Sequence, residues 1–369
     1  MYCWLCLKAG TGKSTLIKFI ISALNLKPED VAYVAFTGKA ASVLRNKGCP
    51  NASTAHKLLY YSKKLPNGKF IFTPKPRLEN NYQLIVVDEI SMLPLELWLL
   101  LLSHKVHILA CGDPFQLPPI NKDSDNHVLD KPHIFLDEIM RQAEESEIIR
   151  LTMDIRNHKP INYFKGSEVQ IVPEDEVVEG MYTWADQIIT ATNRKRAEIN
   201  NYMRAAAGRG DSPEVGDKII ACRNCWDITD SLGNTALVNG TIGYIQSMKE
   251  INKNYPLWNF PIVKLLQSQI LTPDGELFDE VMIDYKALVE GKKALTSQQE
   301  YLLAKRAPLK PFMPIEFNYG YAITCHRAQG SEWDKVLVFE ENFPFDKEEH
   351  ARWLYTACTR PAQKLVLVR

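Results

Sequence analysis

The segment Ala9–Ser14 reads Ala-Gly-Thr-Gly-Lys-Ser, and it constrains the fold more than any other part of the chain. An apolar run, Tyr2–Leu7, precedes it, and a helical pattern, Lys13–Leu24, follows it. A glycine-rich turn between a buried strand and a helix presents backbone N–H groups that bind phosphate oxygens. The sequence therefore predicts an α/β domain that binds a nucleoside phosphate.

Each position of this loop has an expected role. We expect Lys13 to reach the β- and γ-phosphates of ATP and Ser14 to hold Mg²⁺. The other positions expected to bind the nucleotide are Ala9, Gly10, Thr11, Gly12 and Thr15. The full pattern has a further glycine at position 7, where this chain has Leu7. That departure favours, as an alternative, a loop that supports ATP turnover poorly.

Polar groups follow two further apolar runs. Leu84–Val87 leads into Asp88 and Glu89, and Val106–Cys111 leads into a Gly-Asp-Pro-Phe-Gln turn that contains Gln116. Asp88 is expected to bind Mg²⁺ through water, and Glu89 to polarise the attacking water. Gln116 is placed to sense a γ-phosphate. The alternatives are an ordinary acidic pair at a strand end and a simple proline-rich turn.

The second half of the chain contains one more dense motif, Tyr321–Glu332. The neighbours of His326, which are Thr324, Arg327 and Gln329, favour a loop that lies between a nucleic acid and the nucleotide. Two arginines, Arg141 and Arg360, are candidates to stabilise charge during phosphoryl transfer across a domain cleft. Taken alone, each arginine would most often be a surface residue, and His326 a core or capping residue.

Composition limits the possible partners. The 369 residues are enough for two to three domains, and 44 basic residues balance 44 acidic ones. Apolar runs are too short for a membrane span, so we expect no membrane partner and a cytoplasmic protein. Residues 31–78 nevertheless carry nine basic and no acidic side chains, interleaved with aromatic ones. This pattern favours single-stranded nucleic acid, with a solvated basic surface as the alternative.

Alternating strand and helix patterns predict parallel sheets in both halves. Between them, Pro213–Glu316 has short strands and turn signals typical of a small inserted β-barrel, while Lys63–Pro74 predicts a β-hairpin. The polar segment Lys159–Glu179 is expected to be a solvated connector.

The order of these motifs, from AGTGKS through FTGKAA, STAH, VVDEIS, GDPFQLPP and AITCHRAQGSE to YTACTR, resembles the superfamily 1 helicases of the RecD and phage Dda type. The resemblance implies two RecA-like P-loop parallel-sheet domains, a pin hairpin in the first and an SH3-like barrel in the second. The implied domains are 1–158 with the pin at about 60–80, 159–212 together with 317–369, and the barrel at 213–316.

The resemblance also assigns residues. The implied ATPase centre consists of Lys13, Ser14, Asp88, Glu89, Gln116, Arg141 and Arg360. The implied DNA track consists of Thr37, Lys39, Thr54, His56, Asn193, Thr324 and His326, with Phe70 of the hairpin at the duplex junction. Gln329 and Gly330 are assigned to nucleotide binding, next to the DNA track.

The implied activity is ATP- and Mg²⁺-dependent movement along single-stranded DNA with duplex unwinding, in the 5′-to-3′ direction of the family. The expected partners are single-stranded DNA, its junctions with duplex, and replication or recombination proteins, with the chain as a monomer in a bacterial or phage-infected cell. The family carries an adenine-binding segment before the phosphate loop, and we expect it to be absent here. Two alternatives stay open: a truncated DNA-binding remnant that hydrolyses ATP poorly, and an ATPase acting on a protein.

Overall fold

The computed structural model describes residues 2–7, 13–49, 51–64, 70–118, 128–136, 145–233, 235–254, 260–306, 314–342 and 346–369. The chain divides into two compact units. The first unit consists of Met1–Tyr60, Pro74–Arg196 and Ile323–Arg369, and the second of Tyr61–Thr73 and Ala197–Ala322. Both parallel sheets belong to the first unit.

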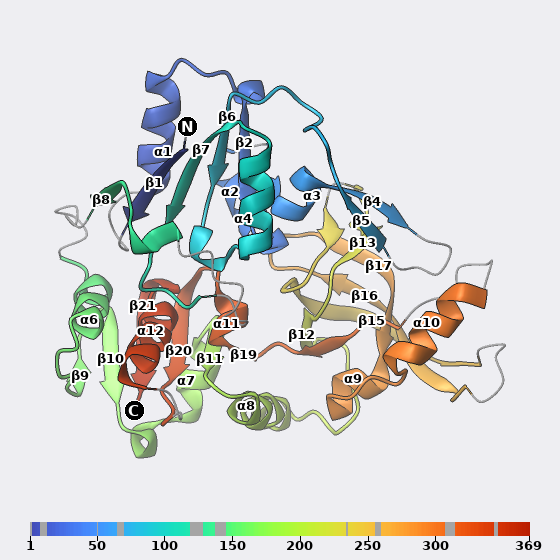
Figure 1. Cartoon of the computed structure of the whole chain (residues 1–369). Helices are drawn as coiled ribbons and strands as arrows, with labels where there is room; N and C mark the ends of the chain where they lie inside the picture. The colour runs from blue at the N-terminus through green and yellow to red at the C-terminus, as the bar shows by residue number, and fades with distance from the viewer. Residues whose placement is uncertain are drawn as a thin grey trace. The chain divides into compact units, whose positions relative to one another are not determined.

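The first sheet has the order β3-β2-β6-β7-β1-β8, and its paired strands run parallel (Figure 1). Its strands are β1 (Tyr2–Leu7), β2 (Val31–Ala35), β3 (Ser53–Thr54), β6 (Leu84–Val87), β7 (His107–Gly112) and β8 (Ile134–Leu136). All four residues of β6 are buried, because a parallel strand covered on both faces needs an unbroken apolar run. This confirms the parallel α/β fold expected from the sequence.

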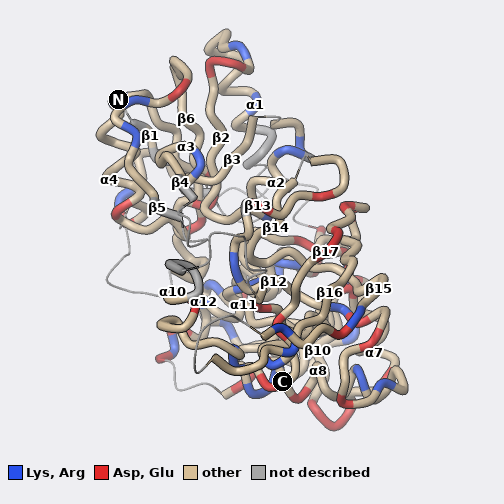
Figure 2. The backbone as a smooth tube through the Cα atoms, turned by 90° about the vertical axis from the view of Figure 1, so that its right-hand side faces the viewer, with Lys and Arg blue, Asp and Glu red and all other residues tan. Residues whose placement is uncertain are grey.

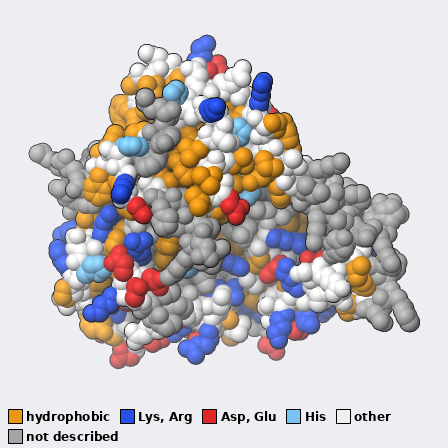
Figure 3. Space-filling view, in the orientation of Figure 1, with side chains coloured by type: hydrophobic (Ala, Val, Ile, Leu, Met, Phe, Trp, Pro, Cys, Tyr) orange, Lys and Arg blue, Asp and Glu red, His pale blue; other side chains and the backbone are white. Residues whose placement is uncertain are grey.

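Helices around this sheet are α1 (Lys13–Ala23), α2 (Gly38–Asn46), α3 (Ala55–Leu59) and α4 (Leu95–Ser103), with short 3₁₀ turns at Pro28–Asp30, Ile90–Met92 and Val128–Asp130. Helix α4 buries Leu97, Trp98 and Leu101 in a cluster that includes Ile85 of β6. Its opposite face is partly apolar as well, since Leu99 is 56% exposed, and hydrophobic side chains gather over α4 in Figure 3.

The second sheet has the order β19-β11-β20-β21-β10-β9. Its strands are β9 (Phe164–Lys165), β10 (Val169–Val172), β11 (Gln187–Thr190), β19 (Ala322–Thr324), β20 (Trp333–Phe339) and β21 (Pro361–Val368). Helices α6 (Glu147–Arg156) and α12 (Lys347–Cys358) pack against each other, and α7 (Glu179–Trp184) and α11 (Cys325–Ala328) flank the same sheet. Strand β10 pairs in parallel with β21, and β9 pairs antiparallel with β10.

The prediction that Lys159–Glu179 is a solvated connector was therefore wrong. The segment contributes two strands to the second sheet, and Val169, Ile171 and Val172 are buried there. The short apolar run Val169–Val172 lies among polar and acidic neighbours, which mask a four-residue strand when the sequence is averaged over longer windows.

The second unit is built on an antiparallel sheet of the order β17-β16-β15-β12-β18. Its strands are β12 (Lys218–Ala221), β15 (Ile242–Lys253), β16 (Val263–Leu271), β17 (Leu277–Asp284) and β18 (Phe317–Tyr319), with β13 (Cys225–Thr229) and β14 (Ala236–Leu237) as a separate pair. The helices are α8 (Asn193–Ala206), α9 (Tyr285–Glu290) and α10 (Ser297–Arg306). Phe278 and Phe317 lie in its buried core. The short strands expected over Pro213–Glu316 are present, and the SH3-like description stays a proposal.

Charged residues of both signs lie along β15 to β17 (Figure 2). Lys264 and Glu250, for example, pair at 2.8 Å across these strands. Among the described residues, no helix is long and apolar enough to cross a membrane.

A buried charge cluster lies at one side of this sheet. Asp217 is 0% exposed, and its carboxylate accepts hydrogen bonds from Arg204 Nε (3.1 Å), Arg209 Nη1 (2.9 Å) and the Tyr321 hydroxyl (3.0 Å). The backbone N–H of Glu214 donates to its second oxygen at 2.8 Å. Burial raises the pKa of Tyr321 to about 12, so this phenol stays protonated as a donor.

The predicted hairpin is present as β4 (Tyr60–Lys64) and β5 (Phe70–Pro74), which form a two-stranded sheet of their own. Its tip, residues 65–69, lies outside the described residues, and Phe72 is 42% exposed. Tyr61–Thr73 groups with the second unit, although the sequence placed the hairpin in the first domain. The pin role and the domain bounds stay proposals.

Candidate active site

The carboxyl ends of three adjacent strands, β6, β7 and β1, carry the predicted nucleotide-binding motifs. Parallel strands bring these ends to one edge of the sheet, which is where open α/β sheets bind ligands. Helix α1 begins at Lys13, as predicted. The loop residues Ala9–Gly12 and the side chains of Lys13, Ser14 and Thr15 lie outside the described residues.

The acidic pair after β6 has an unusual backbone. Glu89 adopts a left-handed conformation (φ 51°, ψ 50°), and its N–H donates to Asp88 Oδ1 at 3.0 Å. The N–H of Asp88 donates to Val34 O of β2 at 2.8 Å. A non-glycine residue in this region is uncommon and is concentrated at functional sites. These bonds hold the backbone of Asp88 and Glu89 at the end of β6 and orient the Asp88 carboxylate.

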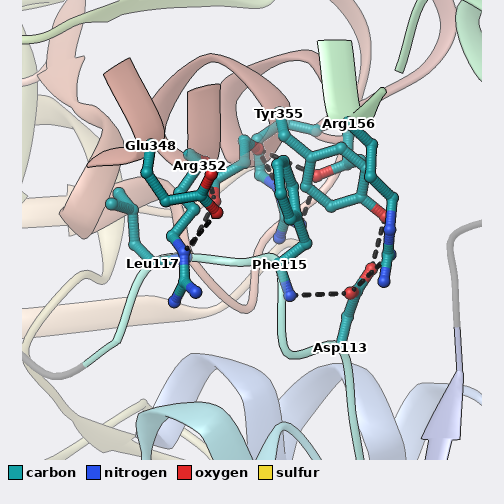
Figure 4. Close-up of polar contacts among 10 residues, drawn as sticks. Asp113, Phe115, Leu117, Arg156, Glu348, Arg352 and Tyr355 are labelled. Atoms are coloured by element: carbon teal, nitrogen blue, oxygen red, sulfur yellow. Dashed lines mark hydrogen bonds and ion pairs between the residues drawn. The ribbon is translucent and has the colours of Figure 1, made fainter. Parts of the chain in front are cut away.

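The loop after β7 contacts helices α6 and α12, and Figure 4 shows Asp113, Phe115 and Leu117 of this loop beside Arg156 and Tyr355. Asp113 is 4% exposed, and its Oδ1 accepts from Phe115 N (3.0 Å) and from Arg156 Nη1 of α6 (3.1 Å). Its Oδ2 accepts a short hydrogen bond from the Tyr355 hydroxyl of α12. The Phe115 ring packs edge-on against Tyr355, with centroids 5.2 Å apart.

The next residues of this loop are held from the second sheet as well. The N–H of Leu117 donates to Thr356 Oγ1 at 2.9 Å, and its carbonyl accepts from Gln329 Nε2 at 2.8 Å. Gln116 directly precedes Leu117 in this loop, and its side chain is 8% exposed. Its Oε1 is buried and has no hydrogen-bond partner among the described residues. A buried polar atom without a partner is costly, so a group that donates a hydrogen bond to Gln116 Oε1 would be stabilised here.

The donor set of this edge fits Mg²⁺ and a nucleoside triphosphate. Carboxylate and hydroxyl oxygens, as in Asp88 and Ser14, are the ligands that Mg²⁺ takes in proteins. Gln116 Oε1, which has no partner among the described residues, offers a further polar group after the neighbouring strand β7.

Arg360 is 6% exposed and is held within the second sheet and α12. Its Nε donates to Thr356 O (2.9 Å), Nη2 to Thr359 Oγ1 (2.9 Å) and Nη1 to Ser331 O (3.4 Å). The guanidinium therefore links the end of α12 to the loop after Gly330. Arg141, the other predicted cleft arginine, lies outside the described residues.

Gly330 permits a close approach between the two sheets of the first unit. Its φ is +75°, and a Cβ built there would lie 3.0 Å from the Ala40 Cβ and 3.4 Å from Thr37 Oγ1. A side chain at this position would be strained by its backbone and would press on the start of α2. The predicted roles of Gln329 and Gly330 in nucleotide binding stay predictions, while their packing places them beside the loop after β7 and the first turn of α2.

The predicted DNA-track threonines lie at helix starts. Thr37 Oγ1 accepts from Ala40 N at 3.1 Å, and Thr54 Oγ1 accepts from Lys57 N at 3.2 Å. Thr324 begins α11 without such a side-chain bond. Thr54 is 6% exposed, so its side chain acts mainly as a cap in this conformation.

Two predicted DNA-track histidines are partly buried, and burial lowers the pKa of both His56 and His326. The ring of His56 stacks on Tyr60 with centroids 5.9 Å apart. Both imidazoles are therefore biased toward the neutral form, which favours ring stacking over phosphate pairing. Asn193 is exposed at the start of α8, Lys39 is half-buried, and the side chain of Phe70 lies outside the described residues.

The nine basic residues between positions 31 and 78, called the basic run below, were expected to face nucleic acid, but three of their side chains bind protein groups. Arg45 donates to Ala52 O at 3.0 Å, Lys47 pairs with Glu332 at 3.2 Å, and Lys75 pairs with Glu79 at 2.9 Å. Lys57 and Arg77 are exposed. Fewer side chains than the count suggested are thus available for phosphate.

Sequence reasoning missed Asp113, Arg156 and Tyr355 as a group. In the motif GDPFQLPP, which contains Asp113, only Gln116 was predicted to act at the site. In the motif YTACTR, which contains Tyr355, only Arg360 was. Their contact joins positions about 40 and 240 residues apart in the chain, which no local pattern reveals.

Two family models match the chain. Residues 3–173 match the AAA domain, and residues 319–368 match the UvrD-like helicase C-terminal domain. These two segments contain the phosphate loop, both strand-end motifs and the two motifs of the second sheet that contact Leu117.

Among similar proteins, the ATP-dependent RecD2 DNA helicase of Deinococcus radiodurans is 27% identical over 95% of this chain and 44% of its own length. The ATP-dependent DNA helicase dda of Enterobacteria phage T4 is 24% identical over 95% of this chain and 91% of its own. The chain thus spans less than half of RecD2 and most of Dda.

A solved Pif1 helicase from Bacteroides, in complex with ADP-AlF3 and ssDNA, matches with a TM-score of 0.52 and 19% identity over 99% of this chain and 88% of that one. At this identity the match establishes the fold alone. By motif order, by the two family models and by these relatives, the chain is similar to the superfamily 1 helicases of the RecD and Dda type.

Proposed function

We propose that this chain is an ATP-dependent DNA helicase or translocase that couples hydrolysis of Mg-ATP to movement along single-stranded DNA and to duplex unwinding. The observation that carries the proposal is the attachment of the loop after β7. The N–H of Leu117 donates to Thr356 of α12, and its carbonyl accepts from Gln329, which follows α11. The neighbouring Gln116 Oε1 is buried and has no partner among the described residues. A change at the nucleotide would reach the second sheet through this loop.

In this proposal the residues of the first sheet bind and hydrolyse ATP. Lys13 binds the β- and γ-phosphates, and Ser14 and Asp88 hold Mg²⁺, which neutralises charge on the phosphate oxygens when it is bound. Glu89 orients and polarises the attacking water, and Gln116 contacts the γ-phosphate. Arg141 and Arg360 stabilise the charge that develops as the bond to the leaving phosphate breaks.

Single-stranded DNA is the proposed track, and its junction with duplex the proposed site of unwinding. Thr37, Asn193 and Thr324, which lie at helix starts, would face the strand, while the buried Thr54 caps α3 beside it. The rings of His56 and His326 would be available for base stacking. The Bacteroides Pif1 relative was solved with ssDNA, which supports this choice of partner. The 5′-to-3′ direction, the pin role of the hairpin, the monomeric state, protein partners and the cytoplasmic location stay predictions from the family resemblance.

One assay separates the proposal from its alternatives. The release of phosphate from ATP is measured with Mg²⁺, with and without an oligothymidylate, together with binding of the labelled oligonucleotide. Turnover stimulated by the oligonucleotide supports the proposal. Binding without turnover indicates a DNA-binding remnant, and turnover that ignores DNA indicates an ATPase acting on another partner. A tailed duplex added to the same reaction then tests unwinding.

A further inference from the structure

Arg156 is not a surface arginine. It is the last residue of α6, its side chain is 13% exposed, and its guanidinium lies 3.1 Å from Asp113 Oδ1. The same guanidinium lies 5.2 Å from the ring centroid of Phe115 and 5.9 Å from that of Tyr355. A planar cation between a carboxylate and two aromatic rings is held by charge and by ring contacts at once.

Asp113 also makes two hydrogen bonds within its own turn. Its Oδ1, which receives Arg156, also accepts from Phe115 N, and its carbonyl accepts from Gln116 N at 3.2 Å. These two bonds close the turn over residues 113–116, a geometry that aspartate side chains favour. The position of the Gln116 side chain therefore depends on the orientation of the Asp113 carboxylate.

Helix α6 connects this turn to the second sheet. It packs against α12, and α12 supplies Tyr355 to the other oxygen of Asp113. A movement of α6 and α12 would therefore displace the Asp113 carboxylate, which both helices contact. The turn that carries Gln116 would be displaced with it.

We propose that Arg156 is a positioning residue for ATP hydrolysis: by holding Asp113, it fixes the turn that presents Gln116 to the nucleotide and ties that turn to the second sheet. The inference rests on the proposed function, in which Gln116 contacts the γ-phosphate. Arg156 itself touches no reacting atom in this arrangement.

The test compares Arg156→Gln with Arg150→Gln, an exposed arginine on the same helix, in the parent and in a Gln116→Ala background. With saturating single-stranded DNA, Arg156→Gln is expected to lower kcat roughly tenfold, with a KM for ATP within about threefold of the parent. Arg150→Gln is expected to change neither. In the Gln116→Ala background, Arg156→Gln is expected to lower kcat no further, because its effect passes through Gln116.

Equal losses of kcat in both backgrounds would overturn the proposal. So would a lower melting temperature with unchanged kcat, which is the result of a purely structural role. Hydrogen exchange of the peptide spanning residues 113–118 provides a readout independent of turnover. Exchange should be faster in Arg156→Gln than in Arg150→Gln, and equal exchange would also overturn the proposal. A parent that hydrolyses no ATP would refute the proposed function instead, and the exchange result would then decide alone whether Arg156 holds the turn.

Discussion

Two buried aspartates in this chain have nearly the same partners. Asp113 in the first unit and Asp217 in the second are 4% and 0% exposed, and each accepts from an arginine, a tyrosine hydroxyl and a backbone N–H. Asp217 has a second arginine, Arg209. Judged by their hydrogen bonds alone, the two clusters would be given the same role.

They differ in what they connect. The partners of Asp217 all belong to the second unit, where Asp217 directly precedes β12. The partners of Asp113 come from α6 and α12, which pack on the second parallel sheet, whereas Asp113 follows a strand of the first. A buried ion pair is weak evidence for stability by itself, so the elements that it joins decide its consequence. We expect the Asp217 cluster to affect folding and the Asp113 cluster to affect turnover.

The largest expected effect is the loss of ATP hydrolysis in a phosphate-loop variant that folds like the parent. Lys13→Ala removes the cationic side chain expected to bind the β- and γ-phosphates and should abolish ATP hydrolysis, while the melting temperature stays that of the parent. Phosphate release and thermal unfolding are measured on the same preparation. ATPase activity near the parent level would remove the phosphate loop from the active site.

In the second unit, a substitution at Asp217 is expected to lower stability while the rate of ATP hydrolysis per folded molecule is kept. Asp217→Asn removes the charge facing two arginines and should lower the free energy of unfolding by about 3–5 kcal/mol, because it leaves the buried Arg204 without its counterion. Urea unfolding followed by circular dichroism measures this loss. A variant as stable as the parent would mean that solvent already reaches the cluster.

Two tyrosines offer a matched pair of smaller changes. Tyr321→Phe and Tyr355→Phe each remove one hydroxyl that donates to a buried aspartate, which is worth about 1.5–3 kcal/mol. Both should lower the melting temperature. Tyr355→Phe alone should also lower the DNA-stimulated kcat, by roughly threefold to tenfold. Equal DNA-stimulated kcat values for the two variants would contradict the proposed difference between the Asp113 and Asp217 clusters.

The smallest effect concerns a half-buried carboxylate that belongs to neither cluster. Glu147 accepts from the N–H groups of Val169 (2.9 Å) and Glu168 (2.7 Å), and these bonds lower its pKa from 4.5 to about 2. A lowered pKa in the folded state stabilises the fold above the unfolded value and loses this contribution as the pH falls toward 2. Glu147→Gln should therefore lower the melting temperature at neutral pH and flatten its fall between pH 4.5 and 2. The exposed Glu145→Gln serves as the control, and an identical pH profile in both variants would show that the bonds do not form.

The sequence predicted the strands that end in functional groups, because buried runs such as Leu84–Val87 followed by Asp88 have both a hydrophobic pattern and a polar stop. It also located the loop after β7, since three polar strand ends in succession are unusual. It missed β10, because the apolar run Val169–Val172 is short and its neighbours are polar.

The contacts within the candidate site were harder to predict. Arg156 ends an amphipathic helix, where a basic residue is ordinary, and Tyr355 lies in an apolar helix face. Only the packing of α6 on α12 brings both to Asp113. Similarly, Lys75 belongs to the basic run in the sequence, and its burial against Glu79 and Lys57 O depends on the base of the hairpin.

The central claim is that the Asp113 cluster serves turnover and the Asp217 cluster serves folding. The most direct measurement is the DNA-stimulated kcat of Asp113→Asn and Asp217→Asn, per folded molecule and at a temperature where both are fully folded. The account predicts a loss of roughly tenfold or more for Asp113→Asn and a rate within about twofold of the parent for Asp217→Asn. Equal rates for the two variants, or a greater loss for Asp217→Asn, would contradict it.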